Sequence, residues 1–259
     1  MNKWKRWTML SVLFLLFAQC NKCKEVVVDP PETEQDTKYV FKWDVVFGNN
    51  NLVQGQTYNH IDGYRLLLED FRGYISNITL YDENDSAFVI QDIALLNWFN
   101  DPQLTITSAP RTIKRIGFSL GIPASINTNT DPTTYPNSSP LSVGGAAGMF
   151  WTWNTGYIFY QLNGKTDLTG SATAPLIDPI AYHCGDDTLF RELIFDVPDV
   201  TVIKGQTQTW NFSLDAQKCF WSDADTLHLD TDYLTHTTGN LPLAIRAMNR
   251  YASSLQWIP

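Results

Sequence analysis

Residues 207–214, TQTWNFSL, carry the clearest β-strand pattern of the chain. Large apolar side chains stand at every second position, at Trp210, Phe212 and Leu214, and polar side chains stand between them. Successive side chains of a strand point to opposite faces of a sheet. The segment therefore predicts a sheet with one buried face and one wet face.

Most of the other strongly patterned segments also resemble strands, because they are rich in β-branched or aromatic residues and end at Gly, Asn, Asp or Pro. They cover residues 39–47, 64–70, 74–81, 112–121, 156–162 and 189–197. Only a short turn at 215–221 and the segment 241–255 have helical patterns, and 127–140 is a polar loop. We therefore predict an all-β domain over residues 38–259, an antiparallel β-sandwich of Greek-key type with a short C-terminal helix.

The N-terminal residues have the pattern of a bacterial export signal. Lys3, Lys5 and Arg6 precede an apolar run at residues 9–18, and Cys20 follows it. The run is shorter than the ~20 apolar residues that span a bilayer. We expect residues 1–19 to be a lipoprotein signal peptide, Cys20 to be lipidated, and residues 20–37 to be a flexible tether. The domain would then be attached to a membrane of the cell envelope, periplasmic or surface-exposed.

The charge balance argues against nucleic acid as a partner. Removing the three cations of the signal from the 18 Lys and Arg leaves 15 against 27 Asp and Glu, a formal charge of −12. Cys184 and Cys219 are the two cysteines of the domain. An exported protein can keep a disulfide, so these two can pair, but the sequence does not place their Cα atoms.

A serine pattern and the histidines are the candidates for chemistry. Residues 117–121, GFSLG, match the nucleophile elbow of hydrolases, but no helix pattern follows Ser119 and the flanks alternate as a strand. We therefore expect no enzyme. His228 alternates with Asp230 and Asp232 close to His236, a pattern that suits either a cation site or a wet strand end.

The segment 148–165, GMFWTWNTGYIFYQLNGK, concentrates large aromatic side chains around Trp151 and Trp153. Two interpretations are open. The indoles can fill the core, where large aromatics usually lie. Alternatively, an indole opened to kynurenine carries an aromatic amine, which together with the imidazole of His183 would suit copper. An unmodified indole has no lone pair to give to a metal.

The residues GMFWTWNTGY at 148–157, LNGK at 162–165 and YHCG at 182–185 resemble the MbnP-like family of envelope copper-binding proteins, which is associated with methanobactin gene clusters. GYISNITL at 73–80 and IGFSLG at 116–121 agree in order. The resemblance implies an antiparallel β-sandwich and a copper site made from histidine and an oxidised tryptophan. It also implies a partner enzyme of the di-haem peroxidase type, which makes that modification.

Carried over by position, the resemblance assigns copper to His183 and to Trp151 or Trp153. The chain departs from the family at Ser139, before Pro140, where a histidine is common. Serine is a poor copper ligand at neutral pH. The expected function is that of a non-catalytic, lipid-anchored envelope protein that binds copper. The alternative is a surface module that binds glycan or peptide without metal, using exposed aromatics beside the 127–140 loop.

Overall fold

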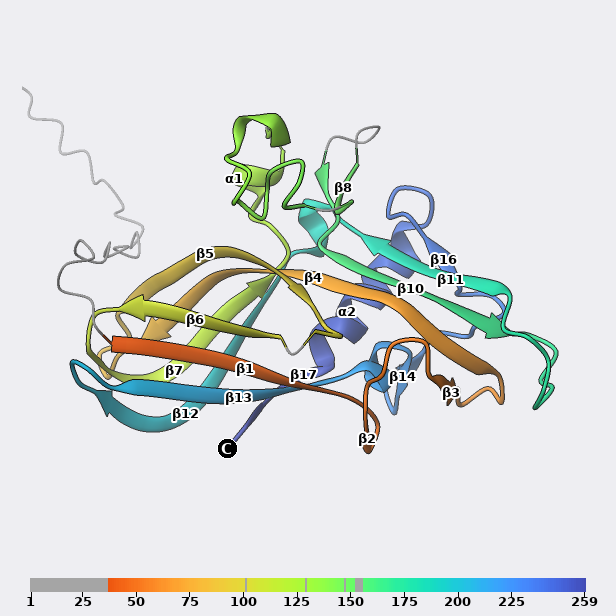
Figure 1. Ribbon diagram of the computed structural model, residues 1–259, viewed down its shortest axis with the longest axis horizontal. Helices are drawn as coiled ribbons and strands as arrows, with labels where there is room; N and C mark the ends of the chain where they lie inside the picture. The colour runs from red at the N-terminus through yellow and green to blue at the C-terminus, as the bar shows by residue number, and fades with distance from the viewer. Residues whose placement is uncertain (1–36, 101, 129, 147, 152–155) are drawn as a thin grey trace, which may run out of the picture.

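Two large β-sheets form the body of the protein (Figure 1). The computed structural model describes residues 37–100, 102–128, 130–146, 148–151 and 156–259. The expected signal peptide, Cys20, the tether up to residue 36, and Trp153 lie outside the described residues. Across the residues that are described, no helix is long and apolar enough to cross a membrane.

The first sheet has five strands within the described residues. It contains β17 (Leu255–Ile258), β13 (Thr207–Asp215), β1 (Thr37–Phe47) and β2 (Asn50–Asn51) in that order, with β6 (Gln103–Ser108) also on β1. β1 and β13 run parallel, which aligns Phe41 with Trp210 and Trp43 with Phe212. The alternating residues of 207–214 therefore bury their apolar face as the sequence predicts.

The second sheet is built around one long strand. Its order is β12 (Arg191–Val202), β7 (Arg111–Leu120), β4 (Arg65–Tyr81), β10 (Tyr160–Asp167), β11 (Asp178–Cys184) and β16 (Leu234–Thr235), and β3 (Thr57–Asn59) and β5 (Ala87–Asn97) also pair with β4. One edge of β4 is divided near Tyr74: β7 pairs beyond this residue and β10 pairs before it. β10 and β11 consequently extend as a wing beyond the two-layered part (Figure 1).

The remaining elements cover the ends of the sheets. They are the hairpins β8 (Phe150–Trp151)–β9 (Gly156–Tyr157) and β14 (Trp221–Ser222)–β15 (Asp225–Thr226), the helices α1 (Ala124–Asn127) and α2 (Leu241–Ser253), and the 3₁₀ turns η2 (Pro132–Thr134), η3 (Asp187–Leu189) and η4 (Ala216–Cys219). The Asn240 side chain accepts a hydrogen bond from the Leu243 amide and so caps α2. α2 packs on β11 and η4.

The structure confirms the all-β sandwich with a short C-terminal helix and corrects several details. The segments 64–70 and 74–81 belong to one strand, β4, rather than two. The final residues of the expected helix 241–255 leave it, because α2 ends at Ser253 and β17 begins at Leu255. The β1–β13 and β11–β16 pairs are parallel, which an entirely antiparallel sandwich does not contain.

Candidate copper site

A row of side chains crosses the wing at one register. Arg72 on β4 pairs with Gln161 on β10, and Gln161 pairs with His183 on β11. β16 then runs parallel to β11, with Tyr182 opposite Thr235, so the next residue, His236, comes beside His183. The two imidazole rings lie 4.7 Å apart between centroids, with their planes at 71°.

Thr237 holds His236 in this place. Its backbone has a φ of 61°, a conformation that β-branched residues rarely adopt. The Thr237 hydroxyl donates to the His183 carbonyl at 2.9 Å and accepts from the Gly185 amide at 2.9 Å. These two bonds, on either side of Cys184, tie the turn after β16 to the end of β11 and so offset the strain.

Trp151 lines the same cavity as the two histidines. It lies in the β8–β9 hairpin, is 6% exposed, and lines a cavity of about 540 Å³ together with Arg72, Gln161, His183 and His236. The structure therefore brings together two of the three expected site residues, Trp151 and His183. It adds His236, which the sequence offered only as a neighbour of His228.

Hydrogen bonding determines which nitrogen of His183 has a lone pair available to a metal. Its Nε2 lies 2.7 Å from Oδ1 of Asn163, and because an amide oxygen only accepts, Nε2 carries the proton. Nδ1 then keeps its lone pair. Burial first, and then the neighbouring His236, lowers the pKa of His183 to about 4. The ring is therefore neutral at pH 7, the form that binds a metal.

The lowered pKa predicts a loss of stability in acid. The unfolded chain takes up a proton at His183 near the usual pKa of 6.5, whereas the folded chain does so only near 4. Between these values the unfolded state binds more protons. The free energy of unfolding therefore decreases as the pH is lowered, by up to about 1.4 kcal/mol per pH unit from this group. Urea unfolding at several pH values should show a shallower acid slope for His183→Gln. Equal slopes in the two proteins would contradict the prediction.

The donors present fit copper only in part. Imidazole suits copper, and the carboxamide on His183 is the kind of outer partner that orients a metal-binding ring. Across the described residues, however, no group of three or more His, Cys, Asp or Glu side chains has an arrangement that holds a metal. The unmodified chain thus offers a pair of imidazoles, and a further donor has to come from another type of group.

The other two histidines lie elsewhere and share one carboxylate. His60 Nδ1 is 3.2 Å from Asp62 Oδ2, and His228 Nδ1 is 3.1 Å from Asp62 Oδ1. Asp232 accepts from Arg246. The cluster that the sequence suggested around His228 therefore does not form, and His60 does not replace the histidine missing at position 139.

Ser119 and the two cysteines are buried. Ser119 lies within β7, opposite Ser76 of β4 and Glu192 of β12, so the strand interpretation of its segment is confirmed. Cys184 and Cys219 are two free, buried thiols in this structure, without the disulfide that the sequence allows. Burial raises the pKa of both, which keeps them protonated and poor metal ligands at neutral pH.

The aromatic platform expected beside the 127–140 loop is not visible in the described part of the chain. Among the large apolar side chains that are strongly exposed there, Tyr233 is the one aromatic, and it lies beside β16 rather than in the loop. The described residues of the loop are mostly exposed or half-buried, but Asn127 is buried and accepts from the Tyr157 amide at 2.9 Å.

Comparison with known proteins identifies the family and a similar fold. The model of the MbnP family matches residues 36–238, a span that contains Trp151, His183 and His236. The solved structure of MbnP from Methylosinus trichosporium is similar in fold, with a TM-score of 0.50 and 14% identity over 73% of this chain and 78% of that chain. A search of curated proteins found no match. Because the family model covers most of the chain, the protein belongs to the MbnP family.

Proposed function

We propose that this protein is a non-catalytic copper-binding protein, with His183 and His236 as its two imidazole ligands. The observation that carries the proposal is the pair of rings 4.7 Å apart in a cavity that Trp151 also lines. Neutral imidazole is a good ligand for copper, and His183 is neutral well below pH 7. The resemblance of residues 148–157 and 182–185 to envelope copper-binding proteins supports the choice of metal.

The further donor would come from an oxidised tryptophan, either Trp151 or the neighbouring Trp153. Dioxygen adds across the C2–C3 bond of the indole and breaks it, giving N-formylkynurenine. Water then releases formate and leaves kynurenine, whose aryl amine has a lone pair that the indole lacks. Trp151 lines the cavity together with both histidines, so this amine would form beside them.

The cellular setting follows from the N-terminal pattern. Export and lipidation at Cys20 would attach the domain to a membrane of the envelope, where it meets copper outside the cytoplasm. A di-haem enzyme of the peroxidase type is the partner that would oxidise the tryptophan. We expect no nucleic-acid partner, because the exported chain is strongly acidic.

A copper titration tests the role of the modification. Cu(I) is titrated against a chromophoric chelator for two preparations, the chain expressed alone and the chain purified from its own host. The host preparation should bind copper more tightly, because it has gained the aryl amine. Equal affinity in a preparation that mass spectrometry shows to be modified would contradict the role of the tryptophan.

Asn163 should position His183 rather than touch the metal. Replacing Asn163 with leucine removes the acceptor of the Nε2 proton, which lies 2.7 Å away. Outer-shell changes of this kind weaken metal binding by about 10–100-fold. The free chain offers a second readout, because ¹⁵N NMR of the His183 ring reports which nitrogen is protonated.

Asn163→Asp is the matched control, because it keeps an oxygen acceptor at the same place. It should preserve the Nε2-protonated form that Asn163→Leu loses. If His183 in the unchanged protein carries its proton on Nδ1, the assignment of Asn163 as the positioning residue is wrong.

A further inference from the structure

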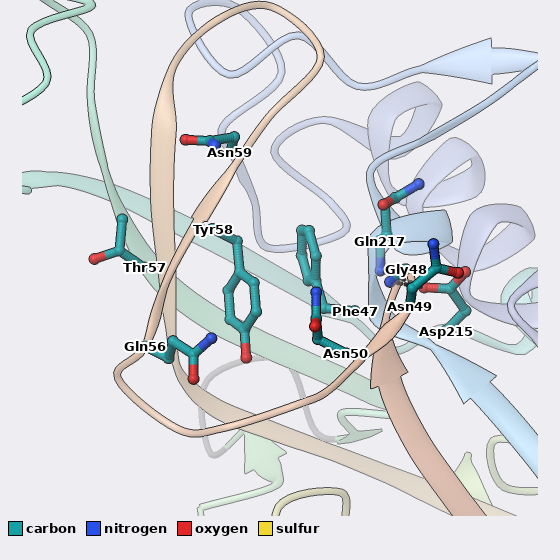
Figure 2. A pocket seen from close by; sticks show the side chains of 10 residues that line it. All are labelled: Phe47, Gly48, Asn49, Asn50, Gln56, Thr57, Tyr58, Asn59, Asp215 and Gln217. Carbon is teal, nitrogen blue, oxygen red and sulfur yellow. Dashed lines mark hydrogen bonds between the residues drawn. The ribbon is translucent and has the colours of Figure 1, made fainter.

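We propose that this protein has a second ligand site, which binds a saccharide, in a cavity lined by side-chain amides. The cavity has a volume of about 560 Å³ and lies between the end of β1, the segment around β2 and β3, and the start of η4 (Figure 2). It shares no lining residue with the copper cavity. Its volume lies within the range of small-molecule sites, about 300–1,000 Å³.

Neutral polar groups surround this cavity. Five side-chain amides line it: Asn49, Asn50, Gln56, Asn59 and Gln217. Within the described residues, the amide groups of these five side chains make no hydrogen bond to the protein. An amide offers two donors and an acceptor, so these solvent-accessible groups can exchange hydrogen bonds with water for hydrogen bonds with a ligand.

A tight turn fixes one wall of the cavity. Gly48 has a φ of 62°, and a Cβ added there would lie 2.7 Å from Oε1 of Gln217. Glycine therefore both permits the turn and lets the Gln217 amide lie against it. Asp215 Oδ1 accepts from the backbone N–H of Gly48 at 2.9 Å and from the backbone N–H of Gln217 at 3.1 Å, which joins the turn to η4. Its Oδ2 is left to accept from a ligand.

Two aromatic rings form the floor. Phe47 and Tyr58 stack with centroids 4.2 Å apart and planes at 19°, and both are buried. The Tyr58 hydroxyl accepts from the Val53 amide at 2.7 Å, so the ring is held in place. Figure 2 shows the two rings between the amide groups of the surrounding loops. Because both rings are more than nine-tenths buried, they fix the base of the cavity and expose little apolar area to a ligand.

The lining chemistry selects the ligand class. Hydroxyl groups both donate and accept, which matches amides and a carboxylate oxygen better than it matches an anion or a cation. The described residues that line the cavity include no Lys, Arg or His, so nothing there neutralises a phosphate or a carboxylate. A neutral sugar with adjacent hydroxyl groups fits this polar lining.

Saturation-transfer NMR on the full-length chain tests this site with glucose, galactose, N-acetylglucosamine, cellobiose and maltose as probes. At least one should receive saturation, and a titration should then give its dissociation constant. Replacing both Asn50 and Gln217 with alanine should weaken that saccharide by about tenfold or more, from the loss of two or more hydrogen bonds. Asn84→Ala, at an exposed turn outside the cavity, is the control and should not change the affinity.

The outcomes separate this site from the copper site. A His183→Ala variant that still binds the saccharide supports an independent cavity. If none of the five probes receives saturation, or if the paired alanine variant binds as tightly as the unchanged chain, the saccharide site is wrong. Neither result bears on copper.

Discussion

Replacing both His183 and His236 with alanine should leave a folded protein that no longer retains copper. The two rings are the imidazoles of the cavity that Trp151 lines, and the unmodified chain offers no third His, Cys, Asp or Glu ligand beside them within its described residues. Loss of a direct ligand should exceed the about 10–100-fold effect of outer-shell changes. Metal analysis after dialysis and Cu(I) competition titrations measure the loss.

His228→Ala is the matched control for this variant. His228 is exposed and bonds to Asp62, away from the copper cavity. The control should therefore retain copper as the unchanged protein does. If the double variant keeps its copper while the control loses it, the metal binds at the other pair of histidines and the assignment made here is wrong.

Replacing Trp43 with alanine should lower the free energy of unfolding by about 3–5 kcal/mol, the usual cost of removing a buried Trp. Trp43 is 1% exposed and lies between the two sheets. Its ring stacks on Phe212 of the first sheet at 5.6 Å and meets the edge of Phe118, on β7 of the second, at 6.0 Å. Trp98 adds a further edge contact at 6.0 Å.

Urea unfolding of Trp43→Ala and Asp44→Ala checks this prediction. Asp44 is the next residue of β1 and its side chain is exposed, so its replacement should change stability by no more than about 0.5 kcal/mol. Similar values for the two variants would mean that the face of β1 carrying Trp43 is not the core.

The sequence predicts the fold class well because the strands of a sandwich bury alternate residues. Residues 207–214 show this alternation and form β13. The pattern weakens where a strand passes between two environments. The neighbours of β4 change at Tyr74, and most of its residues from 73 to 80 are buried without alternation. The sequence pattern of β4 therefore predicts two strands instead of one. The parallel pairing of β1 with β13 joins distant segments, and no local pattern indicates it.

The site residues likewise differ in how well the sequence indicates them. Trp151 and His183 were assigned by resemblance to a family motif, and the structure brings both to one cavity. The sequence does not indicate His236 as the neighbour of His183. β16 has only two residues, and it pairs with residues of β11 that lie 53 positions earlier in the chain. No periodicity can arise in so short a strand. The positive φ of the following turn falls on Thr237, a residue type that does not indicate it.

The most direct test of the copper proposal is intact-mass and metal analysis of the protein purified from its own host grown with copper. We predict bound copper together with the mass change of kynurenine formation, localised by peptide mapping to Trp151 or Trp153. An unmodified chain that carries no copper would contradict it, and His183 and His236 would then be a pair of neutral imidazoles without a metal.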